Sequence, residues 1–341
     1  MAEWLTTDES KMTHPIAQEL NLGAPSRFRY SICTLVNKPD EYSAMLESFV
    51  HAGFDPAFCE YLYIDNSAGT KADAFAGYNA FLNAAQGEYI ILCHQDILLN
   101  QDRIEQLDAC IREMDQVEPS WALLGNAGGV GVGEIVSRLT DPSGSHDTGP
   151  FPIKVRSLDE NFILAKRSAN LCLSQDLSGF HLYGTDLCLV ADILGRTAWV
   201  INFNLHHKSR GKLDASFFEL CTSLMSKYKR VYQGGYIQTT LTVLSVSRSE
   251  CAYRRALFRQ LQMLRKQGQR PGSMLEVEKE LTSLLGKRRY VWHWLCYKAT
   301  RPLENLRSSV AKRLRRFQRG SPPGSPTAQP ATRTTSRRAG L

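Results

Sequence analysis

The chain has 341 residues, of which 43% are hydrophobic and 22% charged, a composition that excludes collagen-like and wholly disordered proteins. Residues 1–250 contain 20 Lys and Arg against 30 Asp and Glu, whereas residues 251–341 contain 21 against 4. We therefore expect an acidic body and a basic tail with different partners. The cysteines form no C-x-x-C pair and the first residues have no signal-peptide pattern, so we expect a cytoplasmic, reducing location without a zinc ribbon or disulfides.

Short apolar runs alternate with helically spaced apolar residues in the first part of the chain. Strands are expected at 30–36, 60–65, 88–93 and 121–124, with helices starting at Pro39 and spanning 71–86 and 101–116. Such alternation predicts an α/β fold with a mostly parallel sheet flanked by helices.

The stretch 125–152 is rich in Gly, Ser, Asp and Pro, and we expect a long substrate loop or lid there. Its glycines lack the G-x-G-x-x-G spacing, so we do not expect a dinucleotide site. Apolar segments at 161–165 and 198–205 flank a predicted helix from Asp186 to Leu194, and the pattern is helical over 217–319.

Polar residues follow the first three predicted strands. Asn37 follows the first, Asp65 and Asn66 the second, and Asp96 the third. Ligands of open α/β sheets collect at these carboxyl ends, and a carboxylate there suits a hard divalent cation. A turn or helix cap is the alternative for each, and for Asn79, on the sheet-facing side of its helix, the alternative is packing against the chain.

Three motifs carry a resemblance. The runs Tyr63-Ile-Asp-Asn-Ser-Ala-Gly69, Gly77-Tyr-Asn79 and Ala85-Gln-Gly-Glu-Tyr-Ile-Ile-Leu-Cys-His-Gln-Asp96 resemble those of GT-A fold, family 2-like glycosyltransferases. His94 stands where that family has the first Asp of its metal-binding Asp-x-Asp, so Asp96 is the residue carried over.

Two further motifs follow in the family's order. Gly179-Phe-His-Leu-Tyr-Gly-Thr-Asp-Leu-Cys-Leu189 resembles the acceptor-side motif, which makes Asp186 the candidate base, although Tyr183-Gly184 replaces the usual acidic pair. Val200-Ile-Asn-Phe-Asn-Leu-His-His207 resembles the strand that ends in a metal-ligand His. Adjacent strand residues face opposite ways, so only one of the two histidines should reach a metal.

The resemblance implies inverting, metal-dependent transfer of a sugar from a nucleotide-sugar donor to a hydroxyl of a glycan or lipid-linked acceptor. It assigns donor binding to Asp65, Asn66, Asn79 and Asp96, and we expect Asn37, at the end of the first strand, to join them. It makes Asp96 and His207 ligands of Mn²⁺ or Mg²⁺, and Asp186 the catalytic base.

The resemblance and the charge pattern together divide the chain. We expect an N-terminal extension over 1–24, a GT-A-like domain over 25–235, a basic helical extension over 236–319 and a disordered tail over 320–341. Arg, Lys, Tyr and Trp of 251–319 suit the cytoplasmic face of an anionic membrane, with plain packing on the domain as the alternative. We do not expect nucleic-acid binding, because no recognition motif is present.

Two other functions remain open at this stage. One is a non-catalytic nucleotide- or glycan-binding protein on the same fold, which the departures at His94 and Gly184 motivate. The other is a nucleotidyltransferase, for which Lys38 is the one basic residue near the first strand end.

Overall fold

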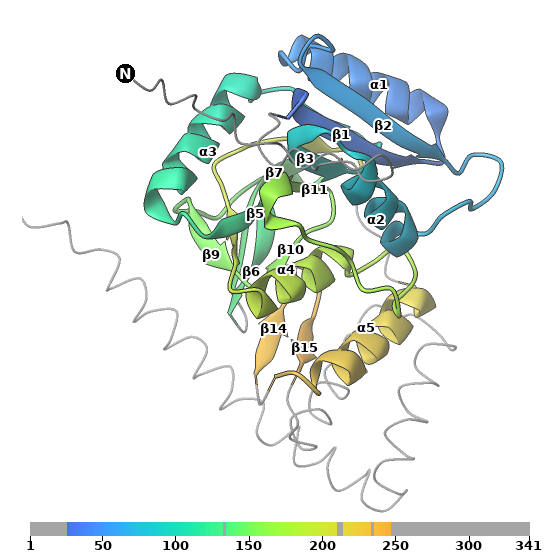
Figure 1. Cartoon of the computed structure of the whole chain (residues 1–341), viewed down its shortest axis with the longest axis vertical. Helices are drawn as coiled ribbons and strands as arrows, with labels where there is room; N and C mark the ends of the chain where they lie inside the picture. The colour runs from blue at the N-terminus through green and yellow to red at the C-terminus, as the bar shows by residue number, and fades with distance from the viewer. Residues whose placement is uncertain (1–25, 132–133, 210–213, 233–234, 247–341) are drawn as a thin grey trace, which may run out of the picture.

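The computed structural model describes residues 26–131, 134–209, 214–232 and 235–246 (Figure 1). The predictions for 1–24, the basic membrane-binding segment 251–319 and the tail 320–341 lie outside these residues. Within the described part of the chain, no helix is both long and apolar enough to cross a membrane.

A seven-stranded sheet forms the centre of the molecule, in the order β2-β1-β3-β11-β5-β12-β9. Strands β2, β1, β3, β5 and β12 run in one direction, while β11 and β9 are antiparallel to their neighbours. The predicted α/β class with a mostly parallel sheet is thereby confirmed. The bounds are β1 (Phe28–Val36), β2 (Cys59–Asp65), β3 (Gly87–Cys93), β5 (Trp121–Gly125), β9 (Ile153–Val155), β11 (Phe162–Lys166) and β12 (Thr197–Val200).

Helices cover both faces of this sheet (Figure 1). Helices α1 (Pro39–His51) and α3 (Ile104–Val117) bury their apolar sides with one set of strand residues, which includes Ile91. Helices α2 (Ala74–Ala84), α4 (Tyr183–Ile193) and α5 (Ala215–Tyr228) pack with the other set, which includes Ile90 and Leu92. The alternation of neighbouring β3 residues between the two cores explains why this strand is apolar almost throughout.

The expectation of a loop over 125–152 is wrong, because most of the stretch forms strands of a second sheet in the order β10-β6-β7-β13-β4, with β8 beside β7. Glycines serve close backbone contact here: a Cβ on Gly129 would lie 1.7 Å from the carbonyl oxygen of Gln238. The bounds are β4 (Ile97–Leu98), β6 (Ala127–Gly131), β7 (Glu134–Asp141), β8 (Gly144–Asp147), β10 (Ser157–Leu158) and β13 (His206–His207).

The core extends beyond the boundary expected at residue 235. Strands β14 (Tyr236–Gln238) and β15 (Val243–Ser245) form a hairpin whose Ile237 and Leu244 are fully buried. These residues are strands, although the sequence pattern had indicated helix from 217 onward; α5 alone agrees with that pattern among the described residues. Within the apolar segment expected over 198–205, β12 ends at Val200 and the buried residues continue to Leu205, after which β13 begins at His206.

Candidate active site

A cleft lies beyond the carboxyl ends of β1, β2 and β3. Because these strands are parallel, the residues that follow them meet at one edge of the sheet. The cleft has a volume of ≈ 510 Å³, within the range of small-molecule sites. Its walls include Asn37, Asn66, Tyr78, His94, Asp96 and Tyr183.

Gln95 ties two of the strand ends together. Its Oε1 accepts hydrogen bonds from the backbone N–H groups of Asn37 at 2.9 Å and Lys38 at 3.0 Å. Its Nε2 donates to Oδ1 of Asn37 at 2.5 Å. Asn37 therefore lines the cleft with part of its side chain already bonded, and Gln95 is a positioning residue that the sequence motifs did not single out.

Asp65 and Asn66 shape the loop after β2. Asp65 accepts hydrogen bonds from the Ser67 N–H at 2.9 Å and the Ser67 hydroxyl at 2.5 Å, which lower the pKa of its carboxyl. Asn66 accepts from the Lys71 N–H at 2.8 Å and lines the cleft, whereas Asp65 lies beside it with 44% of its side chain exposed. Both side chains thus serve the turn, and the second carboxylate oxygen of Asp65 lies 3.8 Å from Lys71 Nζ.

Asn79 does not reach the cleft. Its Nδ2 donates to the Leu173 carbonyl at 3.0 Å, and its Oδ1 accepts from the Leu173 N–H at 2.7 Å. Both ends of the amide are therefore occupied by backbone in a segment distant in sequence. This placement does not support the expected contact between Asn79 and the nucleotide-sugar donor. It agrees with the alternative, in which Asn79 packs against the chain.

Three possible metal ligands meet at the edge of the cleft. Each of His94, Asp96 and His207 offers one ligand atom, and these atoms lie within 4.8 Å of one another. His207 Nε2 is 3.3 Å from Asp96 Oδ1, and His94 Nδ1 is 4.0 Å from the same oxygen. The Nδ1 of His206 instead lies 3.0 Å from the Thr140 hydroxyl, because adjacent residues of a strand point to opposite sides. The structure thus brings Asp96 and His207 together and adds His94.

The three groups shift one another's protonation. Burial and the neighbouring His207 lower the pKa of His94, so its imidazole is neutral near neutral pH. Burial opposes ionisation of Asp96, but its hydrogen bond and attraction to His207 outweigh burial and lower its pKa. The same contact raises the pKa of His207 against the effect of its burial. A carboxylate between two imidazoles is a donor set that fits a divalent metal.

Asp186 lies in the interior, away from the cleft. It is 0% exposed, and its carboxylate accepts hydrogen bonds from the Ser174 N–H at 2.8 Å, the Ser174 hydroxyl at 2.7 Å and the Tyr228 hydroxyl at 2.6 Å. Burial raises the pKa of this carboxyl. An acceptor hydroxyl has no access to these oxygens, so the placement does not support the expected role of catalytic base.

Glu160 is the carboxylate that the motifs missed. The residue is partly exposed, and the backbone N–H groups of Leu182 and Gly184, at the start of α4, favour the ionised form of its carboxyl. Its own backbone carbonyl accepts from the hydroxyl of Tyr183, a residue that lines the cleft, at 2.9 Å. Burial, and then the charge of Asp159, raise the pKa of Glu160 to about 8. The acidic pair just before β11 was the available sequence signal.

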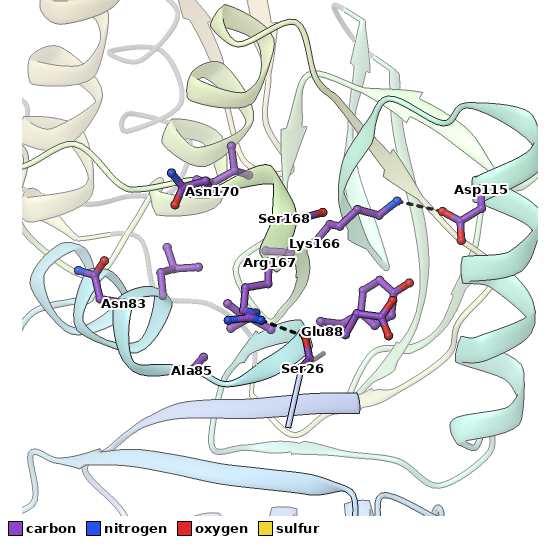
Figure 2. A pocket seen from close by; sticks show the side chains of 14 residues that line it. Ser26, Asn83, Ala85, Glu88, Asp115, Lys166, Arg167, Ser168 and Asn170 are labelled. Atoms are coloured by element: carbon purple, nitrogen blue, oxygen red, sulfur yellow. Dashed lines mark hydrogen bonds and ion pairs between the residues drawn. The ribbon is translucent and has the colours of Figure 1, made fainter. Parts of the chain in front are cut away.

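A second cavity of ≈ 650 Å³ lies at the opposite end of β3 (Figure 2). Its cationic side chains already have partners: Lys166 Nζ is 2.9 Å from Asp115 and Arg167 Nη2 is 3.0 Å from the Ser26 hydroxyl, as the dashed lines show. It holds none of the predicted site residues, and we assign it no chemistry.

Comparison with solved structures returns glycosyltransferases with GT-A-type folds, the class that the motifs resembled. Staphylococcus aureus TarS 1–349 is 12% identical with a TM-score of 0.47, over 78% of this chain and 81% of that one. The mannosyltransferase PcManGT of Pyrobaculum calidifontis, solved with GDP-Man and Mn²⁺, is 11% identical with a TM-score of 0.39, over 85% and 82%. These likenesses concern the fold, and the proposals below rest on this chain's own residues.

No family model matches the chain. One curated protein, "ATP synthase subunits region ORF 6" of Fuscovulum blasticum, is 35% identical over 216 residues, which are 61% of this chain and 87% of that protein. The chain therefore belongs to the same family as that protein.

Proposed function

We propose that the protein transfers a sugar from a nucleotide-sugar donor to an acceptor hydroxyl in a reaction that depends on a divalent cation. The observation that carries the proposal is the cleft at the ends of three parallel strands, with His94, Asp96 and His207 at its edge. In open α/β sheets, ligands generally bind at such a strand edge. The resemblance of the motifs to those of glycosyltransferases is the reason to expect that the nucleotide carries a sugar.

The donor would lie across the ends of β1, β2 and β3. Asp65 would accept a hydrogen bond from the base, and Asn66 and Asn37 would hold the strand-end loops that position the nucleotide. Gln95 would keep the first and third loops in register through its three hydrogen bonds. These contacts orient the donor and add little charge, so binding of a diphosphate needs a cation.

Asp96 and His207, with His94, would hold that cation. The cation, Mn²⁺ or Mg²⁺ in the simplest expectation, would neutralise the diphosphate and stabilise the charge that develops on the leaving group. The carboxylate of Asp96 is ionised and the imidazole of His94 is neutral, so both groups are in the state that binds a metal.

The acceptor proton would pass to Glu160 in place of Asp186. With a pKa of about 8, Glu160 is protonated in most molecules at neutral pH, so its ionised fraction would act as the base and transfer should become faster as the pH rises towards 8. Attack by the deprotonating hydroxyl in a single displacement would invert the anomeric centre. A glycan or lipid-linked acceptor, polysaccharide biosynthesis and work at the cytoplasmic face of a membrane remain the expectations drawn from the resemblance and the basic segment.

Calorimetric titration with UDP and GDP, with and without Mn²⁺, tests the donor site. We expect metal-dependent binding of one nucleotide that is at least ~10-fold weaker in Asp96→Ala, because the cation loses its carboxylate. Asp192→Ala, an exposed carboxylate on α4, is the matched control and should bind like the unaltered protein. Absence of binding to every nucleotide would contradict the proposal. Nucleotide binding without turnover of any sugar nucleotide would favour a non-catalytic binding protein. Release of pyrophosphate from a nucleoside triphosphate would favour a nucleotidyltransferase.

Transfer assays with Glu160→Gln and Asp186→Asn separate the two candidate bases. We expect Glu160→Gln to keep nucleotide binding and lose at least ~100-fold in transfer rate, because the amide cannot take the proton. Asp186→Asn should lower transfer only in proportion to the protein that remains folded. The reverse pattern would restore Asp186 as the base.

A further inference from the structure

The hydrogen bonds around His94 fix which of its ring nitrogens carries the hydrogen. Tyr183 Oη lies 2.9 Å from the Glu160 carbonyl oxygen, 3.0 Å from His94 Nε2 and, more distantly, 3.4 Å from the Tyr78 hydroxyl. A backbone carbonyl can only accept, so the single hydroxyl hydrogen of Tyr183 is donated to it. The hydroxyl oxygen then accepts from His94, which places the ring hydrogen on Nε2 and leaves the lone pair on Nδ1.

That lone pair faces the candidate metal position. Nδ1 of His94 is 4.0 Å from Asp96 Oδ1, and Nε2 of His207 approaches the same oxygen to 3.3 Å. Two imidazole nitrogens and one carboxylate oxygen therefore converge, while the second nitrogen of His94 is held by a hydroxyl. Such outer hydrogen bonds are what orients histidine ligands in metal sites.

We propose that His94, Asp96 and His207 form a three-ligand centre that selects first-row transition ions, in the order Zn²⁺ and Co²⁺ before Mn²⁺, over Mg²⁺, with Tyr183 as a positioning residue. Imidazole nitrogen is a preferred ligand of the later transition ions, whereas Mg²⁺ prefers carboxylate and water oxygens. His94, which stands where an Asp-x-Asp motif has a carboxylate, exchanges one oxygen donor for nitrogen. The inference rests on the proposed function only in that a cation serves this cleft.

The same reasoning predicts what a single substitution does. His94→Asp replaces an imidazole by a carboxylate at the edge of the cleft and so leaves one nitrogen donor, His207. The preference for Co²⁺ over Mg²⁺ should then fall at least ~10-fold. Tyr183→Phe removes the hydroxyl that orients His94, and loss of such an outer partner typically lowers metal affinity ~10–100-fold.

Titration of the full chain with Co²⁺ alone, followed by its visible absorption, measures the centre without nucleotide or activity. We expect a spectrum of histidine-bound Co²⁺ that Zn²⁺ displaces and a large excess of Mg²⁺ does not. His206→Ala is the matched control, because His206 is the adjacent histidine bonded to Thr140, and should leave the spectrum unchanged. Far-ultraviolet circular dichroism checks that each variant is folded.

Each result decides the inference. An unaltered spectrum in folded His94→Ala, or equal competition by Mg²⁺ and Zn²⁺ in the unaltered chain, would overturn it. A shifted spectrum with weakened binding in Tyr183→Phe supports the positioning role, and an unchanged spectrum and affinity refute it. Co²⁺ binding without any nucleotide binding would contradict the proposed function and leave the metal centre supported. Nucleotide binding that needs no metal would contradict the link between the metal centre and the nucleotide site.

Discussion

Replacement of Asp186 should destabilise the fold, because its carboxylate is the common acceptor for three buried donors. The N–H and hydroxyl of Ser174 and the hydroxyl of Tyr228 approach it to between 2.6 and 2.8 Å, and Ser174 and Tyr228 are 8% and 1% exposed. Each buried donor left without a partner costs roughly 1–3 kcal/mol. With three such donors, we therefore expect Asp186→Ala to lower the free energy of unfolding by about 3–9 kcal/mol.

Urea unfolding of the full chain, followed by fluorescence and circular dichroism, measures this loss. Natural domains are stable by only about 5–15 kcal/mol, so Asp186→Asn, which retains one acceptor oxygen, provides a milder second variant with an intermediate loss. Asp192→Ala serves as the control on the same helix: its carboxylate accepts from the Tyr232 hydroxyl at 2.8 Å but is exposed, and the expected loss is under about 1 kcal/mol.

A double-mutant cycle isolates the pair. Tyr228→Phe alone should cost about 1 kcal/mol, and much less in the Asp186→Ala background, because the donor it removes is then already without a partner. An Asp186→Ala variant whose unfolding free energy stays within about 1 kcal/mol of the unaltered chain would refute the structural role. Full stability combined with lost sugar transfer would return Asp186 to the catalytic site.

Two further predictions concern Glu160 and Gly129. The pKa of Glu160 in the folded chain, about 8, lies above its ordinary value of 4.5. Between these two pH values the folded chain holds a proton that the unfolded chain releases. The stability that Glu160 contributes is therefore complete below about pH 4.5 and is lost as the pH rises through 8. Urea unfolding at a series of pH values should show this fall, at up to ~1.4 kcal/mol per pH unit, relative to Glu160→Gln; parallel curves for the two proteins would be evidence against it. Gly129→Ala should cost several kcal/mol, since its Cβ would lie 1.7 Å from the Gln238 carbonyl oxygen, and an unchanged melting temperature would show that the strands separate freely.

The spacing of apolar residues in the sequence was enough to predict the main strands and helices of the fold. The apolar runs that became β1, β2, β3 and β11 are continuous because both faces of the sheet are buried, and the intervening helices have apolar residues on one side. The residue that follows a strand in such a unit lies at the sheet edge whatever its partners are. Asp96 and Asn66 were located at the cleft for that reason.

Long-range contacts decided what the polar residues do there. Whether Asn79 faces a ligand or the chain depends on the Leu173 backbone, and whether Asp186 is a base or a buried acceptor depends on Tyr228 in α5. The strands of the 125–152 stretch likewise depend on the β14 backbone that packs against Gly129. A helix cap, a catalytic carboxylate and a buried acceptor have the same sequence signature, because they differ only in what surrounds them.

The sequence by itself determined the alternation of strands and helices and the polar strand ends, since both follow from local periodicity. Only the tertiary structure decided that His94 joins Asp96 and His207, because the distance between ligands far apart in the chain is set by the pairing of β13 with β4. It also decided that Asp186 is fully buried, whereas Glu160 is a partly exposed residue whose backbone carbonyl is bonded to Tyr183 of the cleft. The charge and access of a carboxyl group are fixed by burial and hydrogen bonding, which only the folded chain defines.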